Sequence, residues 1–91
     1  MPFTLRYHPD VKAKDLPVIN AKMKIRIRNA IEHRLATEPH QYGEPLRKTL
    51  RGYWKLRIGD YRVVFKIVGE DALILGIIHK MKVHEAIEKR G

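Results

Sequence analysis

The sequence contains no cysteine among its 91 residues. Without thiols the chain can form neither disulfides nor cysteine-ligated metal sites. The absence fits a reducing compartment, so we expect a cytoplasmic protein. The opening Met-Pro-Phe-Thr has no charged stretch followed by a long apolar run, so no signal peptide is expected. No apolar run approaches the roughly 20 residues that a membrane span needs, and we expect no membrane partner.

Acidic residues are also scarce. There are 10 Asp and Glu against 19 Lys and Arg, which gives a formal net charge of +9. A chain of this length is expected to form one domain over residues 1–91, with one core. Such a basic domain favours a polyanionic partner: nucleic acid first, then an acidic protein or an anionic membrane. The alternative is a soluble protein with solvated lysines, and the concentration of charge on one predicted sheet face argues against it.

The stretch from Tyr53 to Ile67 predicts two strands joined by a tight turn. Apolar and polar residues alternate along it, which is the period of a half-buried strand. Gly59-Asp60 suits a two-residue hairpin turn. Closing the turn there makes one face wholly apolar, through the pairs Ile58–Tyr61, Leu56–Val63 and Trp54–Phe65. The other face collects polar residues, namely Tyr53, Lys55, Arg57, Arg62 and Lys66. A slip of one residue would bury these charges, so the register is strongly specified.

The first half of the chain predicts a strand and two helices. Residues 3–7 alternate as a strand, and Pro9 or Asp10 can open a short helix that Pro17 should end. Asn20 is a good N-cap for a second helix reaching about residue 36. That helix has one apolar stripe for packing on the sheet, formed by Met23, Ile27, Ala30, Ile31 and Leu35.

The second half predicts a connector, a buried strand and a last helix. Residues 37–45 are predicted to be the connector. Residues 72–78 are almost continuously apolar, which predicts a strand covered on both faces. If Ile67 pairs with Leu73, Leu75 and Ile77 join the core face, and Lys80 follows the strand on the side of Arg62. Residues 82–90 have helical spacing. The order β-α-α-β-β-β-α predicts an α+β fold: an antiparallel sheet, an N-terminal helical hairpin on one face and a short C-terminal helix.

The candidate chemical groups point to RNA rather than to a metal or cofactor, neither of which we expect. His79 and His84 have no acidic partner at ligand spacing, and no Ser-His-Asp set or phosphate-binding glycine loop is present. Attack of a ribose 2′-hydroxyl on its phosphate needs a base, an acid and charge stabilisation. Arginines hold phosphate oxygens, whereas histidine, or a lysine crowded by cations, exchanges protons near neutral pH. The alternative is a patch that binds an acidic partner without chemistry.

Two segments resemble the RelE/ParE superfamily of type II toxins. Residues 50–65, Leu-Arg-Gly-Tyr-Trp-Lys-Leu-Arg-Ile-Gly-Asp-Tyr-Arg-Val-Val-Phe, resemble its hairpin signature. Residues 79–85, His-Lys-Met-Lys-Val-His-Glu, resemble its closing motif, usually His-Arg-Arg-x-Val-Tyr-Glu. The length and the order of elements extend the resemblance over essentially the whole chain. RNA-cleaving and gyrase-poisoning members both carry versions of the hairpin.

The resemblance implies a toxin that a cognate antitoxin neutralises. RelE-like members cleave mRNA in the ribosomal A site. Lys55 and Arg57 match positions that contact or activate the scissile phosphate, and Arg62 matches a phosphate ligand. Lys80 stands where an arginine is common and lacks its guanidinium fork. His84 stands where a catalytic tyrosine is common, and replacing a phenol by an imidazole either makes a better base at neutral pH or marks a remodelled site.

Three functions follow as alternatives. The first is a ribosome-dependent endoribonuclease, with Arg57 and Arg62 on the phosphate, Lys55 or His84 as base and Lys80 assisting the leaving group. Further RNA contacts are expected from Arg47, Lys48, Arg51, Tyr53 and Lys66. The second is a gyrase poison without catalytic groups, and the third a basic module that only binds RNA.

The expected partners of the first function are the ribosome, mRNA and a cognate antitoxin. The antitoxin is expected to be acidic and partly disordered, covering the basic face or displacing the last helix. Among the other histidines, His79 is expected in the core, and His8, His33 and His40 on the surface.

Overall fold

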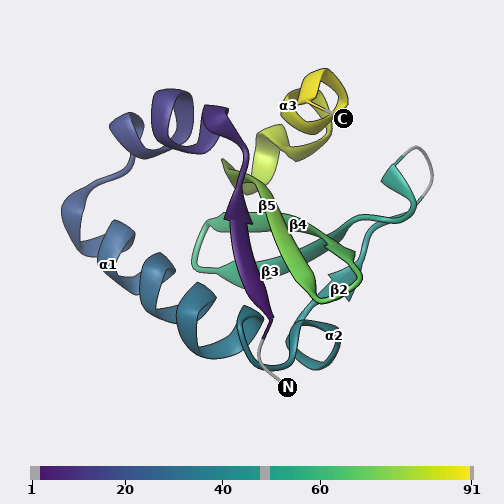
Figure 1. Cartoon of the computed structure of the whole chain (residues 1–91). Helices are drawn as coiled ribbons and strands as arrows, with labels where there is room; N and C mark the ends of the chain where they lie inside the picture. Colours follow the sequence, from purple (N-terminus) through teal and green to yellow (C-terminus); the bar gives the residue numbers. More distant parts are fainter. Residues whose placement is uncertain (1–2, 48–49, 91) are drawn as a thin grey trace.

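The computed structural model describes residues 3–47 and 50–90, and its sheet has the strand order β1-β5-β4-β3-β2 (Figure 1). The strands are β1 (Thr4–Tyr7), β2 (Glu44–Pro45), β3 (Trp54–Ile58), β4 (Tyr61–Val68) and β5 (Asp71–His79). The expected α+β class is confirmed, and β2 to β5 pair antiparallel. β1 joins β5 in parallel, and the long connection between them in sequence contains the N-terminal helices and the other three strands.

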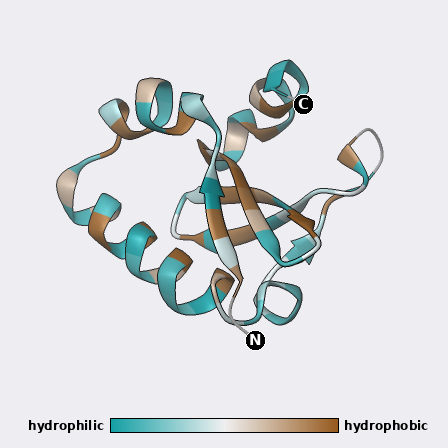
Figure 2. Ribbon diagram, viewed as in Figure 1, coloured by the Kyte–Doolittle hydropathy of each residue, from teal (hydrophilic) through white to brown (hydrophobic). Residues whose placement is uncertain are grey.

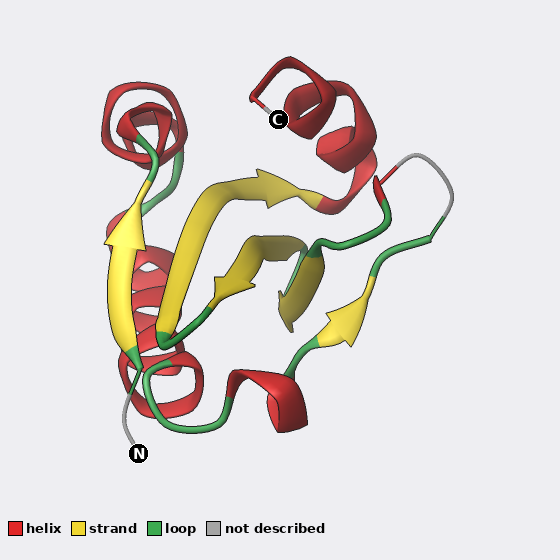
Figure 3. Cartoon of the chain, turned by 45° about the vertical axis from the view of Figure 1, so that its right-hand side comes forward, coloured by secondary structure: helices red, strands yellow, loops and turns green. Residues whose placement is uncertain are grey.

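The helices divide between the two sides of the sheet (Figure 3). On the first side lie η1 (Val11–Asp15), η2 (Leu16–Val18) and α1 (Ala21–Ala30), which continues as the π-helical turn η3 (Ile31–Leu35). On the second side η5 (Lys80–Lys82) leads into α3 (Val83–Arg90). The short helix α2 (Pro39–Tyr42) precedes β2.

The helix boundaries confirm one prediction and correct two. The Asn20 side chain accepts a hydrogen bond from the Met23 N–H at 2.9 Å, as expected of an N-cap. Pro17 does not end the first helix, because it sits in the first turn of η2, where a proline is tolerated. Residues 37–45 are not simply a connector: they hold β2 and also α2, which Pro39 opens.

The register predicted for the β3–β4 hairpin is confirmed at all three apolar pairs. Gly59 in the turn has φ +57°, a left-handed conformation that glycine adopts without strain. The Trp54 and Phe65 rings stack with their centroids 6.4 Å apart. These contacts make the hairpin the fixed frame of the sheet.

The register predicted for β5 is wrong by one residue, because Ile67 pairs with Ala72. A register shift opposite Val64 and Phe65 leaves Leu75 as an extra residue, a β-bulge. Ile77 packs in the predicted core, whereas the bulge turns Leu75 to the other face.

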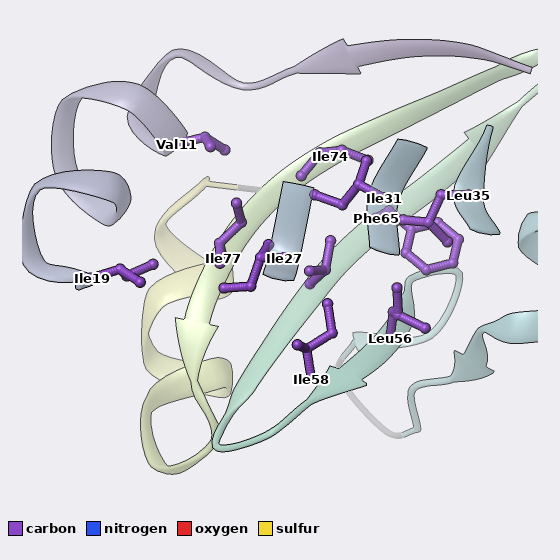
Figure 4. Close-up of a cluster of buried hydrophobic side chains, with 11 residues drawn as sticks. Val11, Ile19, Ile27, Ile31, Leu35, Leu56, Ile58, Phe65, Ile74 and Ile77 are labelled. Carbon is purple, nitrogen blue, oxygen red and sulfur yellow. The ribbon is translucent and has the colours of Figure 1, made fainter. Parts of the chain in front are cut away.

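The sheet is packed on both faces instead of over the one core expected. The first cluster joins the sheet to the N-terminal helices, and Figure 4 shows its side chains meeting there. It comprises Val11, Ile19, Ile27, Ile31, Leu35, Leu56, Ile58, Val63, Phe65, Ile74 and Ile77. The second cluster lies under α3 and comprises Leu50, Val64, Leu75, Ile78, Val83 and Ile87. In Figure 2 hydrophobic residues run along β4 and β5, in keeping with the prediction that the apolar strand is covered on both faces.

Two isoleucines of α1 test this packing, since Ile27 is 1% exposed and Ile25 is 54% exposed. Ile27→Ala should lower the free energy of unfolding by about 2–5 kcal/mol, because it leaves a cavity in the first cluster. Ile25→Ala, the matched control, should change it by less than about 0.5 kcal/mol. Urea unfolding followed by Trp54 fluorescence measures both. Equal effects would show that α1 does not pack as described.

Candidate functional site

Three of the predicted catalytic cations lie side by side on the hairpin face that α1 does not cover. Arg57 and Arg62 are directly opposite one another on β3 and β4. Lys55 lies two residues before Arg57 and therefore on the same face. The confirmed register thus places three cationic side chains on one rigid surface, which we call the basic face, and none of them comes from a loop.

Glu44 is an acidic residue of this face that the sequence reasoning missed. It pairs with Lys55 across β2 and β3, and its Oε2 lies 3.3 Å from Nη2 of Arg57. The side chains of Arg57 and Glu44 are 58% and 53% exposed. An exposed ion pair contributes at most about 1 kcal/mol, so a phosphate can replace the carboxylate at little cost. The only signal for β2 was Pro45, a residue tolerated on an edge strand.

The turn of the hairpin positions Arg62 and one further cation, Lys80. Nη1 of Arg62 donates hydrogen bonds to the carbonyl oxygens of Gly59 and Tyr61, at 3.0 and 2.9 Å. Nζ of Lys80 lies 3.5 Å from Oδ1 of Asp60, and the Lys80 N–H donates to the Asp60 carbonyl at 2.8 Å. Lys80, which follows β5, is therefore brought to the turn that holds Arg62.

The outward face of the hairpin is less uniformly polar than expected. Val64 lies opposite Lys55 on that face, and it is buried under α3. Side chains two residues apart along β4 share a face, so Val64 lies on the same face as Arg62 and Lys66. Lys66 lies beyond it, with Nζ 5.6 Å from the ring centroid of Tyr53, a cation–π contact. Lys66 and Tyr53 therefore lie apart from Arg57 and Arg62.

The two histidines of the closing motif are both exposed. His84 lies in the first turn of α3, and among the hydrogen bonds and ion pairs of the described residues none joins it to the hairpin. The expectation that His79 points into the core is wrong. Its Nδ1 accepts a hydrogen bond from the Met81 N–H at 3.2 Å, and its ring packs edge-on against Tyr61 at 5.8 Å. His79 therefore caps η5 at the exposed end of β5.

Two of the remaining predicted RNA contacts, Arg47 and Arg51, lie between β2 and β3. Arg47 and Arg51 are exposed there, and Lys48 is outside the described residues. Arg57 also borders a hollow of about 280 Å³ beside β3. Its other lining residues are Arg26, Asn29, Ala30, His33, Arg34 and Ile58. Arg26 of α1 and Arg34 of η3 therefore lie around the same hollow as Arg57 of the basic face.

A larger hollow of about 770 Å³ lies between α1 and residues 7–16. Its lining is mainly apolar, and it includes Ile27 and Ile77 of the first cluster. None of the predicted catalytic residues borders it. Within residues 3–47 and 50–90, no three His, Asp or Glu side chains are grouped to hold a metal ion. No helix in the same ranges has the length and hydrophobicity to cross a membrane.

Comparisons with known proteins agree with the resemblance. The family model described as ParE toxin of type II toxin-antitoxin system, parDE, matches residues 5–83. Toxin RelG of Mycobacterium tuberculosis is 28% identical over 86 residues, covering 92% of this chain and 98% of RelG. Toxin RelE of the same organism is 38% identical over 55 residues, covering 60% of this chain and 57% of RelE. The toxin-antitoxin complex RelBE2 of M. tuberculosis contains a chain that superposes with a TM-score of 0.79 at 28% identity, covering 87% of this chain and 92% of that one.

The position of Glu44 predicts how strongly the basic face binds a polyanion. Glu44→Gln removes the carboxylate that occupies Arg57, so affinity for single-stranded RNA should rise by up to about fivefold, the equivalent of one exposed ion pair. Fluorescence anisotropy with a labelled oligonucleotide measures the change. Glu38→Gln, an exposed substitution of equal charge, is the control. An equal gain from both variants would mean that only net charge matters.

Proposed function

The chain belongs to the family of ParE toxins of type II toxin-antitoxin systems, and we propose that it is an endoribonuclease that cleaves mRNA in the ribosomal A site. The observation that carries this proposal is the alignment of Lys55, Arg57 and Arg62 on one rigid face. Three cations on one face suit the negative charge that a phosphate develops during cleavage. The names of the relatives RelE and RelG support the RelE-like branch.

The two arginines would bind the scissile phosphate. Arg57 and Arg62 are cross-strand neighbours, so their guanidinium groups can reach the non-bridging oxygens of one phosphate. As the 2′-oxygen attacks phosphorus, negative charge grows on these oxygens, and positioned donors stabilise it. The 2′-oxygen–phosphorus bond forms while the bond to the 5′-oxygen breaks, which leaves a 2′,3′-cyclic phosphate and a 5′-hydroxyl. The arginines supply the positive charge that a metal supplies in other nucleases.

Proton transfer would use residues around this pair. Lys55 or His84 takes the proton of the 2′-hydroxyl, and the carboxylate of Glu44, on the same face as Lys55, is a third acceptor. Lys80 gives a proton to the departing 5′-oxygen. Because the Lys80 ammonium meets the Asp60 carboxylate in an exposed ion pair, the side chain can leave that carboxylate when RNA binds, while the backbone hydrogen bond keeps Lys80 at the turn.

Cleavage of mRNA on programmed ribosomes tests the proposal. Arg62→Ala should lower the cleavage rate at least tenfold, because a phosphate donor fixed by the turn is lost. Lys55→Ala should lower it similarly, with only a modest loss of ribosome binding. Lys22→Ala removes the same charge from the exposed start of α1 and should leave the rate within about twofold. Mapping of mRNA 5′ ends by primer extension gives the rates.

Two outcomes would contradict cleavage and identify an alternative. Intact mRNA together with inhibited supercoiling would point to DNA gyrase, the target of the gyrase-poisoning branch, which the matched ParE model favours. Salt-sensitive ribosome binding without cleavage would point to a module that only binds RNA.

The antitoxin that we propose is an acidic, partly disordered chain that covers the basic face or displaces α3. The net charge of +9 supports an acidic partner, and the similar chain of RelBE2 was solved in a toxin-antitoxin complex. The apolar hollow beside α1 adds a surface for hydrophobic side chains, with Lys12, Lys24 and Arg28 around it to attract carboxylates.

Co-purification tests this partner. The tagged toxin, expressed from its native operon, should retain a small acidic protein that inhibits mRNA cleavage when added back. Affinity should fall as salt rises, because charge attraction contributes to binding. Recovery of the toxin alone, at low salt and with the operon intact, would contradict the prediction.

A further inference from the structure

Asp15 and Arg90 form an ion pair that is closed to solvent, unlike the pairs of the basic face. Their side chains are 4% and 7% exposed. Nη1 of Arg90 donates to Oδ2 of Asp15, and Nη2 donates to Oδ1, both at 2.7 Å. This two-pronged geometry is the strongest form of an arginine–carboxylate contact. We call the pair the Asp15–Arg90 clamp; it joins η1 to the last residue of α3.

The clamp also binds the backbone of β5 at its bulge. Oδ2 of Asp15 accepts a hydrogen bond from the Ile77 N–H at 2.9 Å, and Nη1 of Arg90 donates to the Leu75 carbonyl at 3.0 Å. The pairing of β1 with β5 ends just before, where the His8 N–H donates to the Ile74 carbonyl. The clamp therefore takes the place of strand partners at the point where β1 has ended.

Gly76 lets the guanidinium lie directly on the strand. A Cβ at this position would come within 2.7 Å of Nη1 of Arg90 and within 3.0 Å of Ile78. Asp10 adds a third anchor, with Oδ2 at 3.5 Å from Nε of Arg90. The hydrogen bond to Asp15 raises the pKa of Arg90 above its ordinary value, so the guanidinium remains charged.

The helix that the clamp holds is too short to be stable by itself. α3 has eight residues and is about 12 Å long, and a helix of that length is marginal in water. Val83 and Ile87 fix its apolar side in the second cluster. Arg90 fixes its end. Replacing a buried ion pair by apolar residues is often neutral for stability, so the contribution to weigh for this pair is the geometry that it specifies.

We propose that Asp15 and Arg90 are positioning residues: by fixing α3 on the bulge of β5, the clamp sets the place of His84, whose neighbour Val83 packs in one cluster with Val64 of the hairpin. His84 lies in the first turn of α3, whereas Lys80, at the start of η5, is held separately by Asp60. This inference rests on the proposed function. A helix released at Arg90 would leave Arg57 and Arg62 on the hairpin unchanged. The clamp should therefore affect the rate of cleavage and not the binding of RNA.

The test uses the full chain and two variants of the clamp. Asp15→Asn with Arg90→Met removes both charges together, so no unpaired charge is buried and the protein should still fold. Arg90→Lys keeps the positive charge but loses the planar guanidinium that donates two parallel hydrogen bonds to the Asp15 carboxylate. Lys89→Met, an exposed change next to Arg90, is the control. Hydrogen exchange reports the docking of α3, and programmed ribosomes give the maximal cleavage rate and the half-saturating ribosome concentration.

In the double variant the amides of α3 should exchange at least tenfold faster, with those of β3 and β4 unchanged. The maximal cleavage rate should fall at least tenfold. The half-saturating ribosome concentration should stay within about twofold of the wild-type value. For Arg90→Lys, the exchange rate of α3 and the cleavage rate should both lie between those of the double variant and wild type. For Lys89→Met, both rates should match wild type. A double variant whose cleavage rate stays within twofold of wild type would overturn the proposal. Faster exchange throughout the sheet, with loss of both cleavage and ribosome binding, would also overturn it.

Wild-type protein that does not cleave would overturn the proposed function and the catalytic part of this inference. The exchange data would still decide separately whether the clamp docks α3. Acceleration confined to α3 would support docking, and unchanged exchange would refute it.

Discussion

The cross-strand register of β3 and β4 is the constraint on which the rest of the structure depends. It is set by apolar pairs on one face, including the stacked rings of Trp54 and Phe65. Because side chains alternate along a strand, burying these pairs against α1 forces Arg57 and Arg62 to face the other way. The position of the cations is therefore a consequence of core packing. No contact between the cations themselves is required to bring them together.

The face of the sheet that α1 does not cover has an apolar half and a basic half. Its half nearest β5 is apolar and must be covered, which α3 does through Val83 and Ile87. Its half on β3 must stay open for a polyanion. The boundary runs along β4, where buried Val64 stands between Arg62 and Lys66. The helix that covers the apolar half is thus unavoidably next to the basic half, which makes α3 a natural carrier for further groups of the site.

Features set by local pattern could be predicted from the sequence. The hairpin, the Asn20 cap and the last helix follow from alternation, a capping residue and helical spacing. The bulge at Leu75 could not be predicted, because a continuously apolar strand has no alternation to mark an extra residue. Of the site, Lys55, Arg57 and Arg62 were placed on one face correctly. Glu44 was missed, since a two-residue edge strand shows no period.

The clamp was beyond prediction for a different reason. Asp15 and Arg90 are 75 positions apart, and nothing in the local sequence of either separates them from the solvated charges around them. Only the fold shows that one pair is buried whereas Arg57–Glu44 and Lys80–Asp60 are exposed. Exposed and buried ion pairs between the same kinds of side chain therefore have different roles. Exposed pairs exchange easily with phosphate, so they suit a surface that must release its carboxylates to bind RNA. The side chains of the buried pair are 4% and 7% exposed, too little for a phosphate to displace either partner, so the pair suits a part of the molecule that must stay in place.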